Sequence, residues 1–158
     1  MSAPVRKNSE KQTAPRYADD LYSWSKHQAS LLRAGRVAEI DALNIAEELD
    51  DVGNEQYGKL ESALSVLLTH MLKWDHQPAM RSRSWVNSIR EQRRRVERLL
   101  RKNPGLKSAL DEAIIEGYED ARDSASTETN LDVSKFTESC HYDFSEITTR
   151  HFSWPVDS

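Results

Sequence analysis

Residues 54–76 read NEQYGKLESALSVLLTHMLKWDH, and this stretch decides the fold class. Its large apolar side chains alternate four and three residues apart, at Leu60, Leu64, Leu67, Met71 and Trp74. That spacing is typical of a helix with a narrow apolar seam that packs closely against other helices. We therefore predict a helix from about residue 54 to residue 76, ended by Pro78, since proline disfavours helical backbone in the residue before it.

Two further helices are predicted on the N-terminal side of this stretch. The carboxylate of Asp19 or Asp20 suits the start of a helix, and Gly35 is placed to end it in a left-handed conformation. A second amphipathic segment covers residues 37–52, and we expect Gly53 to end it.

Two more helices and a short one are predicted on the C-terminal side. Residues 84–102 form a strongly amphipathic segment, and Asn103 with Pro104 offers a helix start for a segment that continues to about residue 124. Beyond that, the apolar residues are irregularly spaced and rich in aromatic rings, with one short helix expected at residues 143–150. Because exposed aromatic rings are costly, we expect this C-terminal segment to pack back on the helices.

The predicted fold is all-α: a single bundle of about five helices with the aromatic C-terminal segment packed on it. Residues 1–16 are polar and lack any apolar period, which predicts a disordered leader. We expect residues 17–158 to form a single helical domain.

Composition narrows the functional class. The chain has 158 residues, a formal net charge of −4 and one cysteine, Cys140, which rules out an internal disulfide framework and a multi-cysteine zinc site. No apolar run is long enough to span a bilayer, and the N-terminus lacks the apolar middle of a secretory signal. These features favour a soluble, cytoplasmic protein.

Five blocks of sequence together resemble a known family. They are ADDLYSWSKHQASLLRAG at 18–35, IAEEL at 45–49, LLTHMLKW-x-x-QP at 67–78, RSRSW-x-x-x-IREQRRR-x-x-x-LL at 81–100, and YEDAR at 118–122. In this order and spacing they resemble the bacterial Domain of Unknown Function 29 family, over about residues 17–154. The resemblance implies an all-helical fold and no established activity. The family's recurring polar positions, none with an assigned role, fall on Glu47, Glu48, His70, Lys73, Trp74, Gln77, Trp85, Arg93, Tyr118 and Arg122.

His70 is the strongest candidate for chemistry. It lies at the margin of the apolar seam, where Glu47 or Glu48 opposite it would make it a metal ligand or a general base. The alternative, which we favour, is a core histidine bonded to one carboxylate. The only Glu-x-x-His spacing, Glu138 to His141, lies in the irregular C-terminal part, so we predict no metal site and no cofactor.

The cationic side chains are concentrated in one helix. Residues 81–102 hold nine cationic side chains against two carboxylates, and Arg90, Arg94, Arg98 and Arg101 share the side opposite the apolar stripe. This arginine stripe has three possible partners: phosphates of a nucleic acid, an acidic protein, or carboxylates of the next helix. We favour this internal pairing, or simple solvation of the arginines, because the next helix carries Asp111, Glu112, Glu116, Glu119 and Asp120 and must lie beside it.

The leading functional hypothesis is a non-catalytic helical interaction module that self-associates or binds another bacterial cytosolic protein. It follows from the missing catalytic constellation and from seams suited to helix–helix contact. The alternatives are nucleic-acid binding through the arginine stripe, and a metal-binding or enzymatic site at His70 with Glu47 or Glu48.

Overall fold

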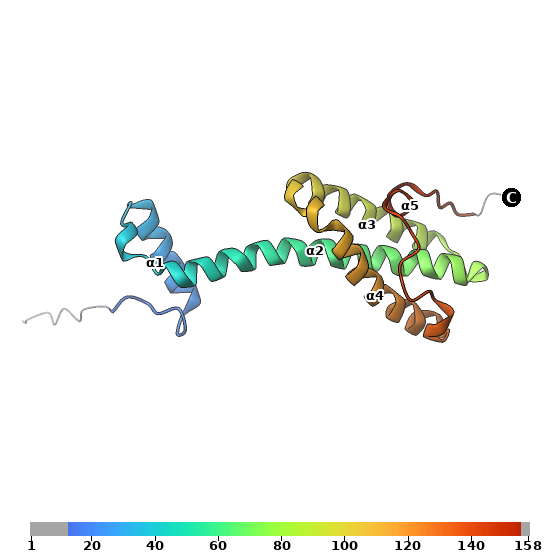
Figure 1. Ribbon diagram of the computed structural model, residues 1–158, viewed down its shortest axis with the longest axis horizontal. Helices are drawn as coiled ribbons and strands as arrows, with labels where there is room; N and C mark the ends of the chain where they lie inside the picture. Colours follow the sequence, from blue (N-terminus) through green and yellow to red (C-terminus); the bar gives the residue numbers. More distant parts are fainter. Residues whose placement is uncertain (1–12, 156–158) are drawn as a thin grey trace, which may run out of the picture. The chain divides into compact units, whose positions relative to one another are not determined.

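The computed structural model describes residues 13–155, and this part of the chain is helical without any strand (Figure 1). Its α-helices are α1 (Leu21–Arg33), α2 (Ala42–His76), α3 (Arg83–Lys102), α4 (Leu110–Thr129) and α5 (Phe144–Thr149). Short 3₁₀ helices precede or follow them, namely η1 (Val37–Glu39), η2 (Pro78–Met80), η3 (Pro104–Ala109) and η4 (Val133–Lys135). The prediction of an all-α fold with about five helices is confirmed.

Internal contacts divide the chain into two compact units, one up to Asp51 and one from Val52 onward. Each unit is described by itself, and a single domain over residues 17–158 stays a prediction. Most of the leader predicted over residues 1–16 lies outside the described residues.

The first unit is held by a few polar contacts. The Asp20 carboxylate accepts a hydrogen bond from the Ser23 backbone N–H at 2.9 Å and so caps α1. Gly35 has a φ of 71° just after α1, as predicted from its position. Trp24, which is buried, donates its indole N–H to Asp41 at 3.1 Å.

Helix α2 is continuous where the sequence predicts two helices separated at Gly53. The helix runs from Ala42 to His76, so the predicted break is wrong. Glycine inside a helix costs only about 1 kcal/mol relative to alanine. Ending the helix there would lose backbone hydrogen bonds on both sides, and no neighbouring group takes their place. The start is also different, because residues 37–39 form η1 instead of the first turn of a longer helix.

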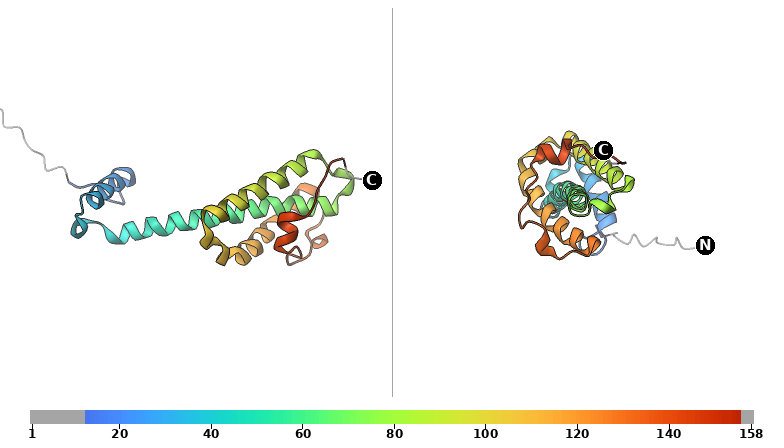
Figure 2. Two further views of the ribbon diagram at one scale, coloured as in Figure 1. Left: turned by 90° about the horizontal axis from the view of Figure 1, so that it is seen from above. Right: turned by 90° about the vertical axis from the view of Figure 1, so that its right-hand side faces the viewer.

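The apolar core of the second unit is built on the predicted seam. Leu60, Leu64, Leu67 and Met71 are fully buried and Trp74 nearly so. In this unit α3, α4 and α5 surround α2 (Figure 2), contributing Val86, Ile89, Val96, Ala113, Ala121, Ala125 and Ile147 to the same core. Gly117 permits the close approach of α4 expected from the sequence: a Cβ atom there would lie 3.2 Å from the Glu61 carbonyl oxygen.

The aromatic C-terminal segment packs on this core as predicted. Phe136, Tyr142 and Phe152 are buried, while Trp154 keeps 43% of its surface exposed. The short helix α5 begins with a capping box in which Asp143 and Glu146 each accept from the other's backbone N–H.

Candidate functional site

The first candidate site is a polar cluster at the C-terminal end of α2. Lys73 is only 9% exposed, and its ammonium lies 2.5 Å from a carboxylate oxygen of Glu128 on α4. The same ammonium lies 4.7 Å from the ring centroid of Trp85 on α3. The ion pair and the indole face compensate for the loss of water around the amine. Lys73 thus connects three helices.

His70 takes no part in an acid–base pair. Its Nδ1 lies 2.8 Å from the carbonyl oxygen of Val66, one turn earlier in the same helix. Burial lowers the pKa of His70, and the nearby charge of Lys73 lowers it further. Glu47 is exposed in the first unit, and Glu48 accepts a hydrogen bond there from the Tyr17 hydroxyl at 2.8 Å. Glu47 and Glu48 belong to the first unit and His70 to the second, so the predicted grouping of His70 with Glu47 or Glu48 stays a prediction.

Other polar positions from the family resemblance hold the end of the bundle together. Gln77 donates its side-chain amide to the carbonyl of Thr129, the last residue of α4, at 3.1 Å. Tyr118 donates its hydroxyl to the Thr137 carbonyl at 2.8 Å, and Arg122 donates to the Phe136 carbonyl at 3.3 Å. These side chains satisfy backbone groups that no helix pairs, which is a structural role.

Trp74 and Arg93 both contact the C-terminal segment. The Trp74 ring meets Phe152 edge to face at a centroid distance of 5.5 Å. Arg93 donates to three backbone carbonyls at the end of α5, those of Glu146, Ile147 and Arg150, at 3.2, 2.8 and 2.7 Å. The guanidinium thus pairs the carbonyls of Ile147 and Arg150 where α5 ends, and shares the Glu146 carbonyl with the Arg150 N–H.

Sequence reasoning missed the ion pair that closes this end of the bundle. Arg150 donates to both carboxylate oxygens of Asp75, at 2.9 and 2.6 Å, and the Tyr142 hydroxyl donates to the same carboxylate at 2.6 Å. Burial of Asp75 opposes its ionisation, but the hydrogen bonds from Arg150 and Tyr142 prevail and lower its pKa. No short-range pattern marks this pair, because the two residues are 75 positions apart.

The second candidate site is the arginine face of α3, which we define as Arg90, Arg94, Arg95 and Arg98. All four side chains are exposed. Within residues 13–155 none of them forms an ion pair or a side-chain hydrogen bond. Arg101, predicted as part of the same stripe, forms an exposed pair with Glu97 at 3.6 Å.

The predicted pairing of these arginines with α4 is therefore wrong. Some carboxylates of α4 contact α2 instead: Glu116 accepts from the Tyr57 hydroxyl at 2.5 Å. Burial and a shared hydrogen bond with Asp120 raise the pKa of Glu61 on α2, which places that carboxylate beside α2 too. Helices α3 and α4 turn their apolar stripes inward, so the side chains opposite those stripes point to solvent.

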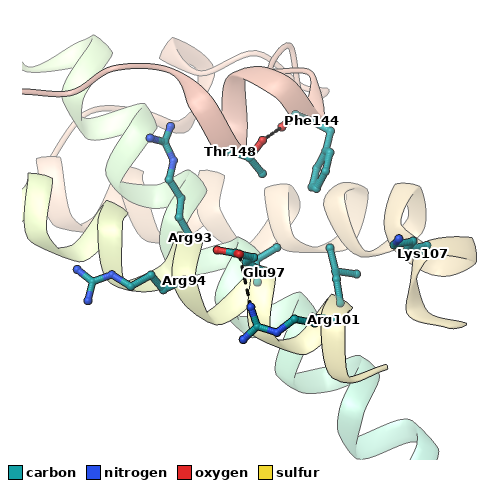
Figure 3. A pocket seen from close by; sticks show the side chains of 9 residues that line it. Arg93, Arg94, Glu97, Arg101, Lys107, Phe144 and Thr148 are labelled. Atoms are coloured by element: carbon teal, nitrogen blue, oxygen red, sulfur yellow. Dashed lines mark hydrogen bonds and ion pairs between the residues drawn. The ribbon is translucent and has the colours of Figure 1, made fainter. Parts of the chain in front are cut away.

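A hollow lies beside the arginine face, between α3, η3 and α5 (Figure 3). Its volume is about 540 Å³, and its apolar lining comes from Val96, Leu100 and Phe144. Charged side chains complete it, namely Arg93, Arg94, Glu97, Arg101 and Lys107. We call it the α3 hollow. Arg94 also lines a second, polar depression on the arginine face, so the two are adjacent.

Comparison with known proteins identifies the family of this chain. The model of a family described as Domain of unknown function DUF29 matches residues 16–153, nearly the whole chain. The chain belongs to this family. No curated protein and no solved structure matches it.

The described part of this DUF29 protein contains no group of three or more histidine, cysteine or carboxylate side chains that could hold a metal ion. None of its helices has a segment long and apolar enough to cross a membrane, as far as residues 13–155 go. The surface that stands out is the arginine face of α3, together with the α3 hollow.

Proposed function

We propose that this DUF29 protein is a non-catalytic interaction module of the bacterial cytosol that binds an acidic protein through the arginine face. The supporting observation is that Arg90, Arg94 and Arg98 are exposed without an intramolecular partner among the described residues.

These arginines do not help the isolated helix. Arg90, Arg94 and Arg98 follow one another at four-residue spacing, and like charges at that spacing destabilise a helix by a few tenths of a kcal/mol per pair. Guanidinium groups bind carboxylates with two parallel hydrogen bonds, so an acidic partner would offset the repulsion. Binding of an acidic partner would therefore give the stripe a role.

Two observations favour a protein over a nucleic acid. The net charge of −4 repels a polyanion at long range, whereas a local acidic patch on a protein is attracted to the face alone. The α3 hollow next to the face also has an apolar lining, which suits an apolar side chain and has no use for a phosphate backbone. Nucleic-acid binding is the second candidate, because the same arginines would contact phosphates.

Affinity purification tests this proposal. The full chain is purified with a tag from the native cells at low salt, with and without nuclease, and the retained material is identified by mass spectrometry. The test variant carries Arg90→Gln, Arg94→Gln and Arg98→Gln. A control variant with the same change in charge carries Arg33→Gln, Arg83→Gln and Lys135→Gln, whose side chains are exposed outside the face.

We expect the wild type and the control to retain a partner protein whether or not nuclease is added. The test variant should retain at least tenfold less of that protein. Retention unchanged in the test variant contradicts the proposal. Material removed by nuclease points instead to nucleic acid.

A further inference from the structure

We propose that the α3 hollow and the arginine face form one binding site for a linear acidic peptide segment of the partner protein. One large apolar side chain of that segment, aromatic or leucine, enters the hollow. Carboxylates within about four residues of this anchor bind the arginines. This inference rests on the proposed function and names the chemistry of the partner's contact.

The first step is the apolar lining of the α3 hollow. Val96 and Leu100 are buried and form its floor on α3. The ring of Phe144, a residue that is 38% exposed, extends from the start of α5 toward α3 (Figure 3). The volume of about 540 Å³ holds one large side chain, and an aromatic ring placed there has Phe144 beside it for an edge-to-face contact.

The second step is the charge of the rim. The hollow is lined by four cationic side chains against one carboxylate, that of Glu97. Arg93 is committed to the carbonyls at the end of α5, and the other three cations are exposed: Arg94, Arg101 and Lys107. The pair of Arg101 with Glu97 joins side chains that are 70% and 73% exposed, so it contributes little and leaves Arg101 available to a second carboxylate. The rim therefore favours an apolar group flanked by negative charge.

The third step is that the hollow and the arginine face are continuous. Arg94 lines both the hollow and the polar depression that Arg90 and Arg98 also line. Residues four apart in a helix differ by about 40° around its axis, so Arg90 and Arg98 flank Arg94 on the same side of α3. One ligand therefore reaches both parts without passing around the helix. The residues of this site all belong to the second unit.

The fourth step is length, which favours a peptide over a small acid. Arg90 and Arg98 are about 12 Å apart along α3, at a rise of about 1.5 Å per residue. A single carboxylate cannot bind both, whereas an extended chain advances about 3.3 Å per residue and spans this distance with about four residues. A segment with one apolar anchor and two or more carboxylates therefore uses the whole site.

The experiment begins with a displayed library of random dodecapeptides, selected at low salt on the purified full chain. The most enriched peptide is synthesised with a fluorescent label, and its dissociation constant is measured by fluorescence anisotropy. Two altered peptides follow: one with its apolar anchor replaced by alanine, and one with its carboxylates replaced by amides. These changes lie in the peptide, so they leave the folding of the protein untouched.

Two protein variants test the two parts of the site. The hollow variant carries Phe144→Ala, and its control carries Ile115→Ala, which removes another exposed apolar side chain outside the hollow. The face variant carries Arg90→Gln and Arg98→Gln, which lie outside the hollow lining. Its control carries Arg83→Gln and Lys135→Gln, which are exposed elsewhere. Circular dichroism and the unfolding midpoint check that each variant folds.

We expect the enriched peptides to share one aromatic or leucine residue with two or more carboxylates within about four positions. Each altered peptide, the hollow variant and the face variant should raise the dissociation constant about tenfold, while both controls bind as the wild type does. If the hollow variant fails to fold, a peptide with benzoylphenylalanine as its anchor replaces it. Under light this peptide should crosslink to the lining of the hollow in the wild type.

Four results overturn the inference: no enriched peptide, enriched peptides without the acidic and apolar pattern, unchanged binding in the hollow variant, or crosslinks outside the hollow. If the purification described above yields a protein that the Arg→Gln triple variant loses, any of these results refutes the peptide site and leaves the proposed function intact. If the triple variant loses no protein, the proposed function fails as well.

Discussion

Asp75 joins the end of α2 to the C-terminal segment through its ion pair with Arg150. The side chains of Asp75 and Arg150 are 24% and 31% exposed. Removing one partner leaves a partly desolvated charge, so we expect Arg150→Gln to lower the free energy of unfolding by about 1–2 kcal/mol. Urea denaturation measures this difference.

The matched control is Arg36→Gln, because Arg36 and Glu39 form an exposed pair within one turn. That change should alter the free energy of unfolding by less than about 0.5 kcal/mol. Equal effects of the two substitutions would show that the Asp75 contact does not hold the C-terminal segment.

His70 predicts a pH dependence of stability. Its pKa in the folded protein lies below the ordinary value of 6.5, because burial disfavours the imidazolium. The unfolded chain therefore takes up the proton first, and the free energy of unfolding falls as the pH is lowered from 6.5 toward the folded pKa. His70→Gln should remove this component. Thermal unfolding at several pH values tests it, and identical slopes in variant and wild type would refute it.

Several important side chains could be picked out from the sequence, but their partners could not. The family resemblance marks Lys73, Gln77 and Arg93 as polar positions on otherwise apolar or amphipathic helices. What each one contacts depends on residues 52 to 57 positions away, such as Glu128 for Lys73. Such pairs are fixed by how the helices pack, which periodicity within one helix does not encode.

For helix α2, the sequence predicted the buried half but not the length of the helix. Its buried half was predictable from the spacing of Leu60 to Trp74, because alternating four and three is specific to a packed helix. Its extent was not, because Gly53 reads equally as a helix end and as a tolerated interior glycine. The apolar residues before Gly53 also follow helical spacing, yet they are exposed. Periodicity reports a helix face and does not say which molecule covers it.

Substitution at Gly53 tests the continuity of α2. A Cβ atom at this position would meet nothing within 4 Å. If the helix is continuous, Gly53→Ala should raise the free energy of unfolding by about 0.5–1 kcal/mol, because alanine favours a helix more than glycine does. Where the free energy does not change, the helical content should rise. The control is Gly35→Ala, which places alanine at a φ of 71° and should destabilise the protein. If Gly53→Ala destabilised the protein as much as Gly35→Ala, the result would contradict a continuous helix and support a helix end at Gly53.

At the scale of the molecule, a net charge of −4 conceals an uneven distribution. The sequence shows that α3 is basic and α4 acidic, and their nearly direct connection suggested that the charges pair. The sequence could not show in which direction around each helix axis the charged side chains point once the helices have packed. Because both helices turn apolar stripes to the same core, the arginines opposite the α3 stripe are directed away from the carboxylates of α4. The surface that supports the proposed function is thus a consequence of core packing.

The account depends on the arginine face being exposed in the isolated chain, where a partner can bind it. An arginine-specific dicarbonyl reagent, with modified sites quantified by mass spectrometry, measures this exposure directly in the purified, dilute protein. We predict that Arg90, Arg94 and Arg98 react rapidly, while Arg93 and Arg150, which donate hydrogen bonds within the chain, stay protected. Slow reaction of Arg90, Arg94 and Arg98, matching that of Arg150, would contradict the account.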